Sequence, residues 1–138
     1  MLFRSDYRVA TRQQAKASDC VADAKSAVRW LRQNAVRLGL DPNRIAAGGG
    51  SAGGHIAAAT FVPGFDSEGE DRSVSCAPNA LVLFNPALVL APMEGLELKG
   101  FGVNLGPDRL GATAQALDRK STRLNSSHIP LSRMPSSA

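Results

Sequence analysis

The clearest pattern along the chain is an amphipathic one between Ser18 and Leu38. Apolar residues recur there at spacings of three and four, which is the period of a helix with one buried face. We expect Ser18 to be the N-cap, Asp19 to stabilise the first turn and Gly39 to end the helix. The apolar positions of this predicted helix are Val21, Ala24, Ala27, Val28, Leu31, Ala35 and Leu38.

Three short segments predict strands, namely Asp6–Ala10, Arg44–Gly48 and Ala80–Phe84. The second and third are apolar on both faces, as strands buried in a parallel sheet are. The small residues of Ser51–Thr60 predict a second helix between them. Strands that alternate with helices indicate an α/β fold, with a parallel sheet flanked by helices.

The remaining segments before residue 79 predict connections. Asp41–Asn43 has the composition of a turn, since Asp, Pro and Asn are all favoured in turns. Glycine, proline and acidic residues between Phe61 and Pro78 predict a loop, and so do the polar residues of Thr11–Ala17. After Ala87, repeated glycines predict a loop-rich stretch.

A glycine cluster between the second strand and second helix carries the candidate chemistry. Gly49, Ser51 and Gly53 form a G-x-S-x-G pattern, which in a nucleophile elbow places serine on a sharp turn from strand to helix. The strained serine requires small residues two positions away. Its hydroxyl can then attack a carbonyl, and the Ala52 N–H faces the developing oxyanion.

The same cluster also matches G-x-G-x-x-G, through Gly48, Gly50 and Gly53. This alternative would make the chain a dinucleotide-binding α/β domain. It requires a second strand that ends in an acidic residue about 20 positions later. The acidic residues in that region lie in a polar segment without a β-run, where the simplest interpretation is a solvated loop. They are Asp66, Glu68, Glu70 and Asp71.

The segment Asp23–His55, DAKSAVRWLRQNAVRLGLDPNRIAAGGGSAGGH, resembles the α/β-hydrolase superfamily, in its branch of feruloyl-esterase-like and hormone-sensitive-lipase-like esterases. A Phe-Asn-Pro ending the next strand, at Phe84–Pro86, is also similar to that family. The resemblance implies a partial α/β-hydrolase fold and a small-molecule carboxylic ester as substrate. It implies an acyl-enzyme at Ser51, with no metal and no cofactor. The implied elbow residues are Gly49, Gly50 and Gly53, with Gly54 and His55 beside them.

The resemblance also implies that the catalytic acid and base follow later strands, in the order Ser, Asp/Glu, His. His55 is four residues after Ser51 on the same predicted helix, so we expect a structural or supporting role rather than that of general base. The chain is therefore expected to be an internal fragment that is inactive by itself. A non-catalytic remnant of the hydrolase fold stays as a further alternative.

The two ends of the chain have a different character. Asp118–His128 back-translates to a short-read sequencing adapter, and Leu2–Ser5 back-translates to the reverse complement of the same adapter family. We therefore expect residues 1–5 to be adapter-derived, 6–117 to be a partial hydrolase domain, and 118–138 to be an adapter-derived disordered tail.

This division changes the meaning of the net charge of +4, which by itself invites a nucleic-acid partner. Without Arg4 and the charged residues of 118–138, basic and acidic residues balance, so no nucleic-acid partner is expected. Two cysteines are too few for a disulfide framework or, by themselves, for a four-ligand zinc site. No apolar run approaches the roughly 20 residues of a membrane span.

Overall fold

The computed structural model describes residues 1–87 of the 138. The loop-rich stretch after Ala87 and the tail 118–138 lie outside the described residues, and the boundaries expected after residues 5 and 117 stay predictions. The described elements are α1 (Ala10–Gln13), α2 (Ala17–Gln33), α3 (Ala35–Leu38), β1 (Ala46–Gly50), α4 (Ala52–Ala59) and β2 (Ala80–Phe84).

The start of the chain differs from the prediction. Residues 6–9 form no strand, and Ala10–Gln13 is a short helix where a loop was expected. The Arg8 N–H donates to the Asp23 carboxylate at 2.9 Å, and the Arg8 guanidinium forms an ion pair with the same carboxylate. Arg8 is thus bonded to a helix side chain instead of to a neighbouring strand, and β structure requires such a neighbour.

Helix α2 begins at Ala17, so the predicted N-cap at Ser18 is wrong and Lys16 holds that position. The Asp19 carboxylate accepts a 2.8 Å hydrogen bond from the Lys16 N–H, which closes the first turn. Asp19 therefore lies in the first turn as predicted. Its negative charge favours the N-terminus of a helix, where amide N–H groups carry partial positive charge.

The single helix expected up to Leu38 is divided in two at Asn34, whose side-chain amide donates to the Trp30 carbonyl at 2.8 Å. Gly39 ends α3 with a φ of +66°, which confirms it as the stop residue. The turn over Asp41–Asn43 is also confirmed. There the Asp41 carboxylate accepts the Asn43 N–H at 2.8 Å.

Strands β1 and β2 pair in parallel, with Ala46 opposite Ala80 and Gly50 opposite Phe84. The bounds of β2 match the prediction, but β1 begins two residues later than expected. Ile45 explains the shift, because its N–H donates to the Asn79 side-chain oxygen at 3.0 Å. This side-chain bond precedes the first rung of the ladder.

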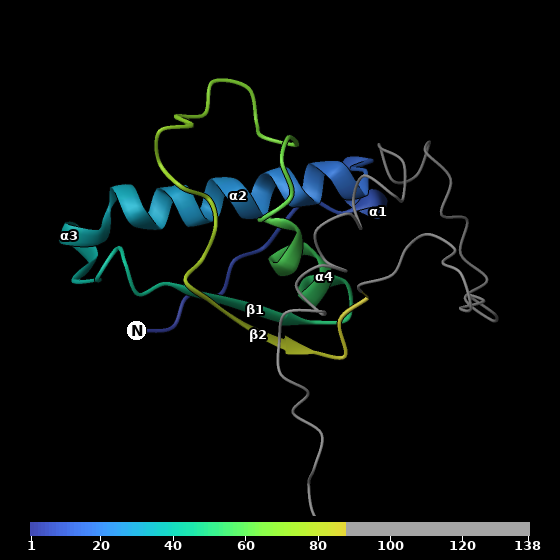
Figure 1. Ribbon diagram of the computed structural model, residues 1–138. Helices are drawn as coiled ribbons and strands as arrows, with labels where there is room; N and C mark the ends of the chain where they lie inside the picture. The colour runs from blue at the N-terminus through green and yellow to red at the C-terminus, as the bar shows by residue number, and fades with distance from the viewer. Residues whose placement is uncertain (88–138) are drawn as a thin grey trace, which may run out of the picture.

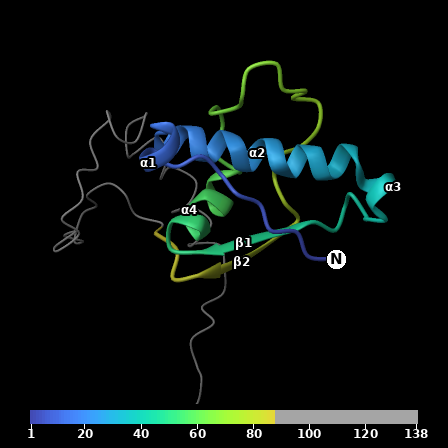
Figure 2. The same ribbon diagram turned by 180° about the vertical axis from the view of Figure 1, so that it is seen from behind.

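The layers stack with α4 between α2 and the sheet, as both views show (Figures 1 and 2). The core lies between these layers. Only one face of the sheet is covered within the described residues, so the expected burial on both faces of the strands is wrong there. Val82 is 51% and Phe84 66% exposed on the open face. The buried apolar side chains include Val21, Val28, Ile45, Ile56, Ala58, Ala59 and Val62.

Candidate active site

Ser51 lies at the junction between the end of β1 and the start of α4. Its backbone has φ +50° and ψ −117°, a combination that is costly for any residue with a Cβ. The residue is exposed. The strand-to-helix turn and the strained serine backbone predicted from the G-x-S-x-G pattern are therefore both present.

Backbone hydrogen bonds hold Ser51 from two elements. Its N–H donates to the Phe84 carbonyl at 3.0 Å, which continues the ladder between β1 and β2 by one residue. Its carbonyl accepts the His55 N–H at 3.1 Å and the Ala87 N–H at 3.2 Å. The main chain of Ser51 is thus fixed by bonds to α4 and to the segment after β2.

The glycines around Ser51 have unequal steric roles. A Cβ on Gly49 would lie 2.7 Å from the Gly53 carbonyl carbon, so position 49 must lack a side chain. Apart from its chain neighbours and the backbone of its own helix, a Cβ on Gly53 would have no atom of the described residues within 4 Å, so the predicted requirement at this position is wrong for the described residues. The second constrained position is Gly54, whose Cβ would lie 2.9 Å from both the Gly49 oxygen and the Pro86 Cβ.

The remaining glycines of the cluster also differ from each other. A Cβ on Gly48 would collide with the Val82 carbonyl oxygen, because β1 and β2 approach closely there. A Cβ on Gly50 would meet the Phe84 carbonyl oxygen at 3.6 Å, an ordinary contact. The sequence did not indicate that position 48 must lack a side chain, because the neighbouring strand lies more than 30 residues later in the chain.

The start of α4 supplies donors beside Ser51. Ala52 is the first residue of α4, and the first amides of a helix have no partner within the helix itself. Their N–H groups carry partial positive charge, which favours an anionic atom at this end. An anionic oxygen that develops on a group bound beside the Ser51 hydroxyl would therefore meet a favourable local field.

His55 lies one turn into α4 and is only 4% exposed. Its backbone N–H donates to the Ser51 carbonyl, whereas its side chain is buried among α4 neighbours that are also buried. Ser51 itself is exposed. The imidazole therefore occupies the interior and not the surface at which the serine is presented.

An apolar pocket of about 650 Å³ lies beside the glycine cluster. Gly49 lines it from β1, Gly53 and Ile56 line it from α4, and Phe3 and Tyr7 line it from the N-terminal segment, whereas Ser51 is not among its lining residues. Its walls are suited to apolar groups, because few polar side chains contribute to them.

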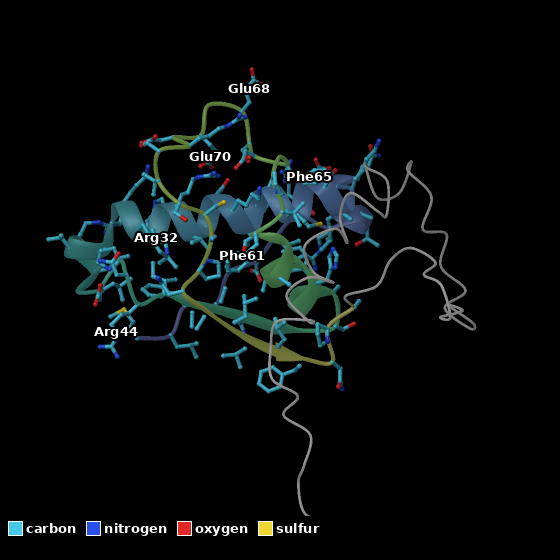
Figure 3. The ribbon with its side chains drawn as sticks, in the orientation of Figure 1. Arg32, Arg44, Phe61, Phe65, Glu68 and Glu70 are labelled. Carbon is cyan, nitrogen blue, oxygen red and sulfur yellow. The ribbon has the colours of Figure 1, made fainter. Side chains whose placement is uncertain are left out.

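Acidic residues expected in a solvated loop belong instead to a partly buried ion-pair network. Asp66 accepts a 2.6 Å hydrogen bond from Arg29 and lies 3.7 Å from the Lys25 ammonium. Glu70 lies 3.7 Å from Arg29 and faces α2, whereas Glu68 points away from the helix (Figure 3). Lys25 and Arg29 are 2% and 4% exposed. The expectation of a solvated loop is therefore wrong for Asp66 and Glu70.

The pKa of Asp66 reflects two opposing effects. Burial disfavours its ionised form, but the hydrogen bond from Arg29 and the charge of Lys25 outweigh burial and lower the pKa below its ordinary value. The Lys25 ammonium also donates to the Val62 carbonyl at 2.7 Å and to the Gly64 carbonyl. The network thus ties the segment after α4 to helix α2.

The dinucleotide alternative receives no support from this arrangement. Residues 60–79 contain no strand, and such a site needs a strand that presents an acidic residue. Asp66 and Glu70 are engaged by Lys25 and Arg29 instead. Residues 1–87 also contain no group of three side chains that could hold a metal ion, and none of their helices has the length and apolarity to cross a membrane.

Solved structures of one bacterial esterase share this fold. The native esterase 2 of Thermogutta terrifontis is 50% identical and superposes with a TM-score of 0.70, covering 81% of this chain and 40% of that protein. The same esterase phosphonylated by sarin gives a TM-score of 0.72 at 47% identity, covering 81% and 42%. Parallel strands flanked by helices are thus part of an α/β-hydrolase fold, as the sequence predicted.

Sequence relatives are esterases as well. The carboxylesterase NlhH of Mycobacterium tuberculosis is 47% identical over 53 residues, which cover 38% of this chain and 16% of that protein. The arylesterase of Saccharolobus solfataricus is 41% identical over 63 residues, covering 46% and 20%. The matched part thus spans about a fifth of these relatives. The BD-FAE family model matches residues 1–77. The chain belongs to the BD-FAE family, within the α/β-hydrolase esterases.

Proposed function

We propose that Ser51 is the nucleophile of a carboxylic ester hydrolase. The observation that carries this proposal is the backbone of Ser51, which has φ +50° at a turn from strand to helix. Such strain persists only where the surrounding structure holds it, and it concentrates at functional sites. Membership of an esterase family and the esterase relatives support the same role.

In the proposed reaction, the Ser51 hydroxyl oxygen attacks the ester carbonyl carbon and loses its proton to a general base. The Ala52 N–H stabilises the oxyanion of the tetrahedral intermediate, and the positive end of α4 adds to this stabilisation. The protonated base gives its proton to the leaving oxygen, so the alcohol leaves and an acyl group remains on Ser51. Water then attacks the acyl-enzyme and releases the carboxylic acid.

The proposed substrates are small carboxylic esters with apolar acyl groups. The related esterase 2 of Thermogutta terrifontis has structures with propionate and butyrate bound, which are short acyl products. His55 is proposed as a supporting residue, because its side chain is buried within α4.

A chimera tests the role of Ser51. Residues 17–87 of this chain would replace the matching segment of esterase 2, which then provides the rest of the fold. We expect the chimera to hydrolyse p-nitrophenyl butyrate, and Ser51→Ala to reduce kcat/KM at least about a thousandfold. Ser26→Ala is the matched control, because Ser26 lies on α2 and contacts Ser67.

The 138-residue chain provides the second arm of this experiment. We expect it to show no turnover of p-nitrophenyl butyrate above buffer, because the one histidine among residues 1–87 is buried His55. Turnover that Ser51→Ala abolishes would contradict this inactivity. A folded chimera without activity, or one that keeps its activity after Ser51→Ala, would instead favour a non-catalytic remnant.

A further inference from the structure

The end of β2 and the residues just after it bind both the N–H and the carbonyl of Ser51. The Phe84 carbonyl accepts the Ser51 N–H at 3.0 Å, and the Ala87 N–H donates to the Ser51 carbonyl at 3.2 Å. Both bonds come from one stretch of four residues. The path of the chain from Phe84 to Ala87 therefore decides whether Ser51 receives both bonds.

Asn85 sets this path through its backbone. It has φ +43°, in the left-handed region that residues with a Cβ seldom adopt and that asparagine tolerates best among them. Gly50 pairs with Phe84, so Ser51 and Asn85 follow at the same level of the sheet. The parallel strands β1 and β2 end at the same side of the sheet, where α4 also begins (Figure 1).

Pro86 anchors the turn against α4. The position that a Cβ would take on Gly54 lies 2.9 Å from the Pro86 Cβ and 3.1 Å from its Cα, so the two residues are in close contact. The proline ring also fixes its own φ, which leaves the chain between Asn85 and Ala87 little freedom. The turn thus packs against the first turn of α4, next to Ser51.

We propose that Asn85 is a positioning residue for Ser51. Its left-handed backbone conformation carries the Ala87 N–H to the Ser51 carbonyl and thereby holds Ser51 in its strained conformation. Asn85 is exposed, so it acts through the direction of its backbone and not through side-chain packing. The catalytic importance of this positioning rests on the proposed role of Ser51 as nucleophile, whereas the geometric relation stands without it.

NMR on the full 138-residue chain tests the proposal. Asn85→Val places a β-branched side chain at positive φ, so the Ser51 and Ala87 amides should exchange about tenfold faster relative to those of α2. The Ser51 Cα and Cβ shifts should also move away from values typical of positive φ. Asn85→Gly should restore both signals, because glycine adopts positive φ without strain.

Gln14→Val is the matched control. Gln14 is another non-glycine residue at positive φ, with φ +54° after α1, and it has no bond to Ser51. It should leave the Ser51 signals unchanged. If Asn85→Val does not fold, Asn85→Ala makes the same test with a smaller penalty.

Two results would overturn the proposal. Ser51 signals in the folded Asn85 variant could equal those of the wild type, or Asn85→Gly could fail to restore them. The NMR experiment does not measure turnover. An inactive chimera would therefore refute the role of Ser51 as nucleophile and leave the positioning role of Asn85 intact. Conversely, unchanged Ser51 signals would refute the positioning role without affecting the chimera.

Discussion

At the scale of single residues, the turn at Ser51 depends on which neighbouring positions have room for a Cβ. Gly49 and Gly54 have none, because the Gly53 backbone crowds the first while Pro86 and the Gly49 oxygen crowd the second. Gly53 has room among the described residues. The two adjacent glycines of α4 therefore differ, because position 54 must lack a side chain whereas position 53 has room for one.

This difference predicts opposite effects of one substitution at adjacent positions. Gly54→Ala should lower the free energy of unfolding by about 1–3 kcal/mol, because its Cβ would overlap two contacts at 2.9 Å. Gly53→Ala should raise it by about 0.5–1 kcal/mol, because alanine favours a helix over glycine. Urea denaturation of both variants measures these changes. Equal effects of the two substitutions would contradict the assignment of Gly54 as the crowded position.

At the scale of elements, α2 is more than an amphipathic helix with a solvated polar face. Lys25, Arg29 and Arg32 follow each other at spacings of four and three, and all three bind the segment between α4 and β2. Arg32 donates to the Pro42 carbonyl at 3.1 Å, to the Ser75 carbonyl at 2.5 Å and to the Asn79 side chain at 3.1 Å. Since Asn79 also bonds Ile45, α2 is connected to the starts of both strands.

Asp66 is the acidic centre of this connection. Asp66→Asn should lower the free energy of unfolding by about 3 kcal/mol, because nearly buried Lys25 loses its counter-charge and nearly buried Arg29 keeps only Glu70 at 3.7 Å. Glu68→Gln is the matched control in the same loop, and it should change stability by less than about 0.5 kcal/mol, because Glu68 is exposed. Urea denaturation at neutral pH compares them. Similar small losses for both variants would show that the network does not stabilise the fold.

The stability of the wild type and of Asp66→Asn at acidic pH is a further control. The pKa of Asp66 is lower in the folded chain than in the unfolded chain. The stabilisation that its carboxylate provides is therefore complete at pH values above the pKa of the unfolded chain. It is lost as the pH falls through the pKa of the folded chain. The gap between wild type and Asp66→Asn should therefore be constant from pH 7 to 5 and should narrow below about pH 3.9. A gap that persists at lower pH would have another cause.

At the scale of the molecule, the sheet is covered on one face by α4 and α2 and open on the other within residues 1–87 (Figure 1). Exposed Val82 and Phe84 stand on the open face, while Leu83 is turned toward the helices. Contiguous exposed apolar side chains on a strand favour association between molecules. The covered face holds the core, whereas the open face exposes apolar surface to contacts with other molecules.

Two substitutions on adjacent residues of β2 separate these faces. Phe84→Lys should reduce concentration-dependent association, measured by light scattering, and change the free energy of unfolding by less than about 0.5 kcal/mol. Leu83→Lys should destabilise the fold by several times that amount, because it places a charge toward the core. If Phe84→Lys leaves association unchanged, the open face is not the surface that drives it.

The sequence by itself determined the helix stop at Gly39, the turn at Asp41–Asn43, the bounds of β2, and a serine on a strained turn from strand to helix. These features depend on residues close together in the chain: the period of the apolar positions, the φ allowed to glycine, and the order strand, serine, helix. The esterase family could be recognised for the same reason, because its motif is a continuous segment.

Only the tertiary structure decided which segments meet. In the structure, Arg8 contacts Asp23 where the sequence predicted a strand. Asp66 and Glu70 form ion pairs with Lys25 and Arg29. The tertiary structure also assigned the crowded position of the turn to Gly54, through a proline more than 30 residues later. Contacts between distant segments leave no local pattern in the sequence, because each partner alone resembles an ordinary loop or an exposed helix face.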